Sequence, residues 1–187
     1  AVTRQVSSYT PDLIKEYGLE AMITGSDQVW RPRYNRFLED MFFRFAKDAR
    51  IKKVAYAASF GVDFWEYTDE QTVACKKWIQ QIDSVSVREA SGIDLCKRYF
   101  NVEALEMLDP TLLLDKEDYE NVCRDVPVEE KSFIASYILD LTPEKERFIR
   151  KIAAEKGLSV KIFSANKEMK WSVEEWLSMF RDANYIV

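Results

Sequence analysis

The sequence predicts an α/β fold, in which parallel strands alternate with helices that lie on the faces of the sheet. Short apolar segments with strand character alternate along the chain with segments whose apolar residues recur at helical spacing. A polar cluster follows each of the early strands. The alternation is interrupted by a charged segment and then restarts, which predicts one domain over residues 1–120 and a second over 121–187.

The first domain is expected to contain four strands. A helix is predicted to begin at Thr10 and Pro11, with Thr10 as its N-cap. Residues 69–82 form an amphipathic pattern, and a further helix is expected through Ile93, Cys96 and Tyr99. The aromatic-rich residues 35–46 fit a helix followed by a short extended piece, and the pattern does not decide. The predicted strands are residues 20–24, 52–59, 84–87 and 102–108.

The second domain is predicted to repeat the same rhythm. Residues 116–130 are strongly charged and contain Pro127, which is typical of a boundary. A strand over 184–187 is the last element, so we expect the chain to be a truncated start of this domain. The predicted elements are a strand over 132–139; a helix from Thr142 and Pro143 to Gly157 with Phe148, Ile149, Ile152 and Ala153 on one face; a strand over 158–163; and a helix opened by a capping box at Ser172 and Glu175 with Trp176, Leu177 and Phe180 inward.

Composition excludes several classes of function. The formal net charge of −5 argues against a nucleic-acid partner, and no apolar run approaches the roughly 20 residues of a membrane helix. The three cysteines lack metal-ligand spacing, so we expect them to be buried and reduced, as in a cytoplasmic protein. The chain contains no histidine and no glycine-rich nucleotide loop. No cofactor and no metal are therefore expected.

Polar residues follow each predicted strand of the first domain. Ligands of open parallel sheets bind beyond the carboxyl ends of the strands, so the clusters are expected to converge on one edge. A glycine-containing turn with a helix behind it would cradle an anion, and Arg88 would clamp a carboxylate or phosphate. Asp27 would accept a proton or bind sugar hydroxyls. The clusters are Gly25, Ser26, Asp27 and Gln28; Ser59, Phe60 and Gly61; Arg88 and Glu89; and Asp109, Pro110 and Thr111.

Each cluster also has a purely structural interpretation. Asp27 would cap a helix, and Gly61 would end a strand with a positive φ. Arg88 and Glu89 would form an ion pair or begin a helix, and Asp109 would bond its own turn. The aromatic side chains within residues 64–67, which are Phe64, Trp65 and Tyr67, would either stack on a sugar ring or pack in the interior. Both sets of interpretations stay open at this point.

Segments of the chain resemble, in order, motifs of the polysaccharide pyruvyl transferase family. The resemblance implies two Rossmann-like domains in a GT-B-like arrangement, the second only begun in this chain. It also implies transfer of a pyruvyl group from phosphoenolpyruvate to a sugar of a bacterial surface polysaccharide, forming a ketal. The segments are Ile23–Trp30, Lys53–Gly61, Ser86–Glu89 and Leu108–Leu113, and they cover roughly residues 20–115.

The resemblance implies roles and partners as well. The partners would be phosphoenolpyruvate and a glycan or lipid-linked sugar acceptor, in the cytoplasm; a homo-oligomer stays open. Family members are thought to use a histidine in the second domain, after a strand such as 184–187, so we expect this fragment alone to be inactive. The alternatives are a GT-B-like glycosyltransferase that uses a nucleotide sugar and a non-catalytic glycan-assembly module. Asp27 and Arg88 would be catalytic, and Gly25, Ser26, Gln28, Ser59, Phe60, Gly61, Glu89 and Asp109 would bind substrate.

Overall fold

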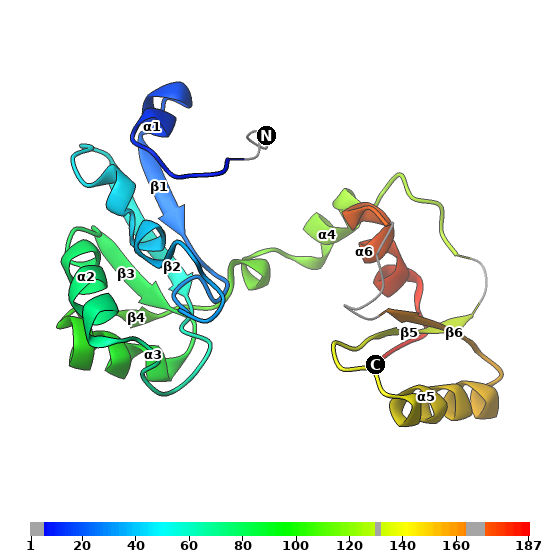
Figure 1. The fold of residues 1–187 in the computed structure, drawn as a ribbon. Helices are drawn as coiled ribbons and strands as arrows, with labels where there is room; N and C mark the ends of the chain where they lie inside the picture. Colours follow the sequence, from blue (N-terminus) through cyan, green and yellow to red (C-terminus); the bar gives the residue numbers. More distant parts are fainter. Residues whose placement is uncertain (1–5, 130–131, 164–170) are drawn as a thin grey trace. The chain divides into compact units, whose positions relative to one another are not determined.

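The computed structural model describes residues 6–129, 132–163 and 171–187, and it divides the chain into two compact units (Figure 1). Unit 1 is Ala1–Leu113 and unit 2 is Leu114–Val187. Each unit has its own parallel sheet flanked by helices. The predicted α/β, Rossmann-like fold class is therefore confirmed. Among the described residues no helix has the length and apolar character needed to cross a bilayer.

The sheet of unit 1 has four parallel strands in chain order, β1-β2-β3-β4. Because each strand lies beside its successor, all crossovers run in the same direction, and the carboxyl ends of the strands share one edge. Three strands lie close to their predicted positions, whereas the fourth is shorter than expected. The strands are β1 (Ala21–Thr24), β2 (Lys52–Ala58), β3 (Ser84–Val87) and β4 (Leu105–Glu106).

A bulge near the end of β2 shifts its register against β3. Ala55 pairs with Val85 and Ala58 pairs with Val87, so β2 holds one residue more than β3 between these pairs. The hydroxyl of Ser86 fills the irregularity, because it donates to the Ala55 carbonyl at 3.0 Å and accepts from the Ala57 amide at 2.9 Å. The bulge reverses the alternation of side chains beyond it.

Helices and 3-10 turns connect the strands of unit 1. Helix α2 begins at a capping box between Thr68 and Gln71. Helix α1 has Pro11 in the N-cap position without a side-chain cap, so the predicted Thr10 cap is wrong. Residues 35–46 form two 3-10 turns, because the left-handed Phe43 (φ 61°) separates them. The elements are α1 (Asp12–Glu16), η1 (Leu38–Phe42), η2 (Arg44–Ala46), α2 (Asp69–Ile79), α3 (Ala90–Leu95), the π-turn η3 (Cys96–Phe100) and η4 (Pro110–Leu113).

The core of unit 1 lies between the sheet and these connections. Trp30 is fully buried and stacks on Phe42 with ring centroids 4.8 Å apart. The hydroxyl of Tyr67 donates to the Trp30 carbonyl at 2.5 Å, which satisfies the polar end of a buried ring. Cys75 and Cys96 are buried here as free thiols, and Cys123 is buried and free in unit 2, as expected.

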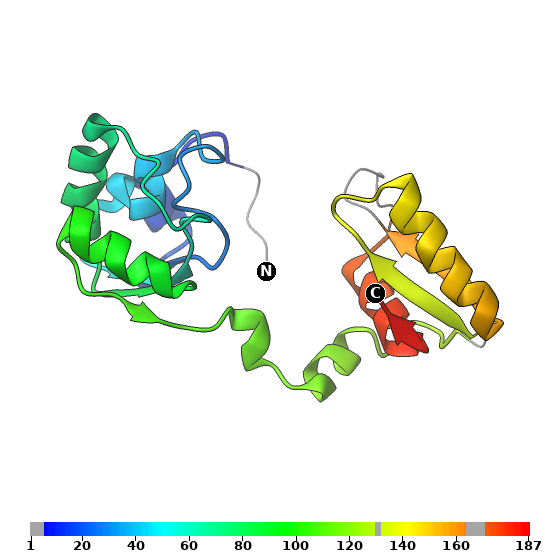
Figure 2. The same cartoon turned by 90° about the horizontal axis from the view of Figure 1, so that it is seen from below.

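Unit 2 contains a three-stranded parallel sheet in the order β6-β5-β7. Helix α5 lies on one face and α6 on the other, as both views show (Figures 1 and 2). Ile134 packs with Ile149 and Ala153 toward α5, while the Tyr137 ring meets Trp176 of α6. The elements are α4 (Lys116–Val122), β5 (Phe133–Tyr137), α5 (Pro143–Lys156), β6 (Ser159–Phe163), α6 (Val173–Asp182) and β7 (Tyr185–Ile186).

Most helix signals of unit 2 are confirmed. The Thr142 and Ser172 hydroxyls cap α5 and α6, and Gly157 ends α5 in the left-handed conformation. Phe148, in contrast, is 64% exposed, so its predicted place on the inward face is wrong. The inward stripe of α5 is formed by residues such as Ile149, and Phe148 lies one position, or about 100°, away from it.

Candidate functional site

The carboxyl ends of β1, β3 and β4 are joined by side chains. The Ser26 hydroxyl, after β1, donates to Asp109 Oδ2 at 2.7 Å. Arg88, after β3, donates from Nη1 to the same oxygen at 3.5 Å. Asp109 follows β4, so its carboxylate connects three loops.

The loop after β2 joins the same group through Glu89. Arg88 Nε donates to Glu89 Oε1 at 2.9 Å, and the fully buried Ser59 hydroxyl donates to that oxygen at 3.0 Å. Ser59 Oγ in turn accepts from the Gly61 amide at 2.9 Å. The expected convergence is therefore present in the structure. We call the set Ser26, Ser59, Arg88, Glu89 and Asp109 the edge network.

A second ion pair, which the sequence did not predict, supports the loop after β1. Arg31 donates to both carboxylate oxygens of Glu66, at 3.0 and 3.2 Å, and holds the pKa of Glu66 below its usual range. Arg31 Nη1 also donates to Gln28 Oε1 at 3.1 Å. A Cβ on Gly61 (φ 71°) would lie 2.1 Å from this Gln28 oxygen, so a side chain here would displace Gln28 and strain the backbone.

Asp27 is the exposed carboxylate of the first loop. Its Oδ1 accepts from the Gln28 amide at 2.7 Å, and its main-chain carbonyl accepts from the Ser59 amide at 3.2 Å. The backbone is thus fixed while the side chain stays open to ligands. It borders a cavity of about 350 Å³ lined by Asp27, Gln28, Val29, Tyr34 and Asn35.

Two expectations for these loops are corrected. Residues 26–37, all described, form turns and not a helix, so no helix N-terminus lies behind the Gly25 turn and Asp27 caps none. Gly25 is needed for space, because a Cβ there would lie 1.9 Å from the Tyr56 carbonyl oxygen. Phe60 is 3% exposed and packs on Trp30, so it does not reach the edge as a substrate contact would.

The electrostatics of the edge network favour hydroxyl donors over anions. The Ser26 hydroxyl, the amide and hydroxyl of Thr111, and Arg88 lower the pKa of Asp109 to about 2. The pKa of Arg88 is raised, first by Glu89 and then by Asp109. Together with Asp27, the carboxylates outnumber the single guanidinium. Among the described residues, Arg88 Nη2 makes no hydrogen bond and remains the group available to an anion.

Comparison with known proteins then identifies the family. A family model described as polysaccharide pyruvyl transferase matches residues 4–187, which spans both units. The chain belongs to the polysaccharide pyruvyl transferase family. The searches of curated proteins and of solved structures each found no match. The family's name denotes a transferase that acts on polysaccharide.

In this member of the polysaccharide pyruvyl transferase family, several structural roles are also confirmed. Asp109 bonds its own turn, through the Thr111 amide at 3.0 Å and hydroxyl at 2.7 Å. Arg88 and Glu89 form an ion pair, and Glu89 is the N-cap residue of α3. Gly61 adopts the predicted positive φ. The same residues thus build the loops and line the shared edge.

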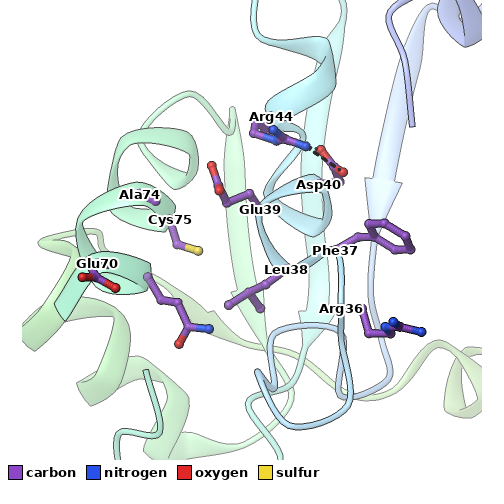
Figure 3. A pocket seen from close by; sticks show the side chains of 10 residues that line it. Arg36, Phe37, Leu38, Glu39, Asp40, Arg44, Glu70, Ala74 and Cys75 are labelled. Carbon is purple, nitrogen blue, oxygen red and sulfur yellow. Dashed lines mark hydrogen bonds and ion pairs between the residues drawn. The ribbon is translucent and has the colours of Figure 1, made fainter. Parts of the chain in front are cut away.

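A further cavity in this pyruvyl transferase family member, of about 390 Å³, lies between η1 and α2 (Figure 3). Four of its polar side chains already have structural partners. Asp40 and Arg44 point toward one another and pair at 3.0 Å (Figure 3), and Glu39 accepts from the Trp78 indole at 2.8 Å. Gln71 is held in the capping box of α2. None of the strand-end residues lines this cavity, so it is not the candidate site.

Proposed function

We propose that the protein transfers a pyruvyl group from phosphoenolpyruvate to a sugar, and that the carboxyl edge of unit 1 holds the reacting sugar hydroxyls. One observation carries this proposal for the edge. An exposed carboxylate, Asp27, stands beside a network in which Glu89 and Asp109 outweigh Arg88 in charge. Ionised carboxylates only accept hydrogen bonds, and sugar hydroxyls are donors that such a surface attracts.

The chemistry proposed for the complete reaction is ketal formation. The oxygen of one sugar hydroxyl bonds to C2 of the donor as that hydroxyl gives up its proton to a base, and a proton is added to C3, which converts the methylene group to a methyl group. The oxygen of a second hydroxyl then bonds to C2 as the bond from C2 to the phosphate oxygen breaks. The second hydroxyl proton is taken up by a base or by the leaving phosphate. The products are a pyruvate ketal and inorganic phosphate.

In this proposal Asp27 orients a sugar hydroxyl and accepts its proton. Arg88 meets the carboxylate of the donor through Nη2, while Glu89 and Asp109 fix the plane of the guanidinium. Gly25, Ser26, Gln28, Ser59 and Gly61 shape the loops that carry these groups. Because the chain has no histidine, proton transfer within it falls to other groups, of which the Asp27 carboxylate is the one proposed here.

We also propose that the protein acts in the cytoplasm on a glycan or lipid-linked acceptor. The three free, buried cysteines support a reducing compartment, where disulfides rarely persist. Whether a homo-oligomer forms is measured directly by light scattering.

The test is phosphate release from phosphoenolpyruvate by the full-length protein with a panel of sugar glycosides. We expect acceptor-dependent release that falls at least about tenfold in Asp27→Asn and in Arg88→Lys, a loss of about 1.4 kcal/mol each. Asp125→Asn is the matched control, because Asp125 is 99% exposed in unit 2. No release with any acceptor, together with thermal stabilisation by a nucleoside diphosphate, would instead indicate glycosyl transfer.

A further inference from the structure

A groove of about 350 Å³ lies on unit 1. It is formed between the loop that follows β2 and helix α3 with its continuation η3. These same two segments supply Ser59 and Glu89 to the edge network. The two walls of the groove therefore begin only a few positions along the chain after Ser59 and Glu89. We call it the α3 groove and define it by Asp63, Phe64, Asp94, Arg98 and Tyr99.

One wall of the α3 groove is a rigid aromatic stack. Trp65 is sandwiched between Tyr99, at 4.1 Å and 6°, and Tyr67, at 4.3 Å and 17°. The Trp65 indole donates to the Thr72 hydroxyl at 2.9 Å, which fixes the ring further. Phe64, next in the chain, is 59% exposed at the rim of the groove. The groove thus offers an aromatic surface that is preformed and partly open to solvent.

The two carboxylates of the α3 groove are not used by the fold. Within the described residues, neither the Asp63 nor the Asp94 carboxylate makes a hydrogen bond or ion pair, and both residues are exposed. Arg98 is the cation that lines the groove, and it lies over the Tyr99 ring at 5.4 Å from the centroid. The carboxylates outnumber this cation, so the groove is net negative.

We propose that the α3 groove is a subsite for an uncharged sugar ring of the acceptor; this rests on the proposed function only in naming the ring as part of the acceptor. The apolar face of a sugar ring packs on aromatic side chains such as Phe64, while its hydroxyls donate to carboxylates. The excess of carboxylates disfavours uronic acids and phosphorylated sugars. The volume lies within the range of small-molecule sites.

A cationic ligand finds no open ring face on Trp65 or Tyr99. Cations bind over the open faces of aromatic rings. Both faces of Trp65 are covered, by Tyr67 and Tyr99, and Arg98 already lies over Tyr99. The aromatic surface that remains open is that of Phe64, and choline therefore serves as the competing cation in the test below.

The proposal is tested by titrating the whole chain with methyl glycosides of neutral hexoses, followed by calorimetry and ligand-observed NMR. We expect at least one neutral glycoside to bind with a Kd in the millimolar range, and Phe64→Ala to weaken it at least about fivefold. The matching uronic acid should bind more weakly, and Asp94→Asn should narrow that difference. Phe148→Ala and Asp125→Asn, at exposed positions of unit 2, should leave binding unchanged.

Several outcomes would overturn the subsite. They are the absence of binding by every neutral glycoside, equal binding of the uronic acid, unchanged binding in Phe64→Ala, or preferential binding of choline. Phosphate release from phosphoenolpyruvate is measured separately, so the two proposals fail independently. Glycoside binding that is lost in Phe64→Ala supports the subsite even if no phosphate is released. If the native chain releases phosphate and Phe64→Ala binds the glycoside as tightly as the native chain does, the subsite is overturned and the proposed function is not.

Discussion

The hydroxyl of Ser26 donates to the carboxylate of Asp109 at 2.7 Å, across 83 positions of sequence. This contact joins the loop after the first strand of unit 1 to the loop after the last. Arg88 reaches the same carboxylate from between them. The relative position of the loops therefore depends on the Asp109 carboxylate, and single substitutions of its donors remove its hydrogen bonds one at a time.

Ser26→Ala removes the largest contribution to the low pKa of Asp109. We expect the Asp109 pKa to rise from about 2 toward the ordinary value of about 3.9. Loss of this partly buried hydrogen bond should also lower the free energy of unfolding by about 1 kcal/mol. Carboxyl-detected NMR titration and denaturant unfolding measure the two effects, with the exposed Ser8→Ala as control. An unchanged Asp109 pKa would contradict the assignment of its cause.

Asp109 should make the stability of unit 1 depend on acid pH. Its pKa is lower in the folded state, so its stabilisation is present above about pH 4 and is lost as the pH falls toward about 2. Asp109→Asn lacks this titration. Unfolding measured from pH 5 to pH 2 should therefore show a stability difference between the native chain and the variant that shrinks as the pH falls. A difference that stays constant with pH would argue against the depressed pKa.

Gly25→Ala should strongly destabilise unit 1. A Cβ would lie 1.9 Å from the Tyr56 carbonyl oxygen, and the φ of 127° disfavours any other residue. We expect a loss of about 3 kcal/mol or more in the free energy of unfolding. Gly18→Ala is the matched control, because Gly18 also has a positive φ but no described heavy atom within 4 Å of its Cβ position. That control should cost only about 1 kcal/mol, and equal losses would contradict the crowding at Gly25.

Replacing Arg181 should destabilise unit 2 more than replacing any other arginine of that unit. It donates to the carbonyls of Cys123 and Val126, at 2.9 and 3.2 Å, and pairs with Asp182, which is 5% exposed. Arg181→Ala should lower the free energy of unfolding by about 2 kcal/mol, because charged hydrogen bonds are lost. Arg150→Ala removes an exposed pair on α5 and should cost about 0.5 kcal/mol or less. Thermal unfolding of both variants checks this order.

Much of the architecture follows from local patterns. The alternation of Ser and Val predicted β3 at its observed bounds, and the capping box at Ser172 located the start of α6, since both signals are confined to a few residues. Features that depend on contacts between distant parts of the sequence were harder to predict. Strand β4 is only Leu105–Glu106 because its extent depends on pairing with β3, and the charged segment predicted as a boundary contains α4, whose charges lie on a helix surface.

The candidate site shows the same limit. That the strand-end clusters meet at one edge could be predicted, because parallel strands place their carboxyl ends together. The pairing of Arg88 with Asp109, and of Arg31 with Glu66, could not, since side-chain direction over such separations is set by tertiary packing. Phe60 was expected at the edge because it follows the predicted strand, but its side chain packs in the core beyond the β2 bulge, which no local pattern indicated.

The bulge in β2 divides that strand into two parts that differ in which alternate residues face the core. Up to Ala55, alternate residues face the core, and beyond the bulge this alternation is shifted by one residue. Ala58 and Phe60 therefore pack inside, while the Ser59 hydroxyl donates to Glu89. A one-residue insertion, or a deletion outside the bulge, would exchange the faces of the residues on one side of it, and deletion of Tyr56 or Ala57 would remove the irregularity that the Ser86 hydroxyl fills. Insertions and deletions here are therefore far more damaging than substitutions, and β2 can drift in composition only if its length is kept.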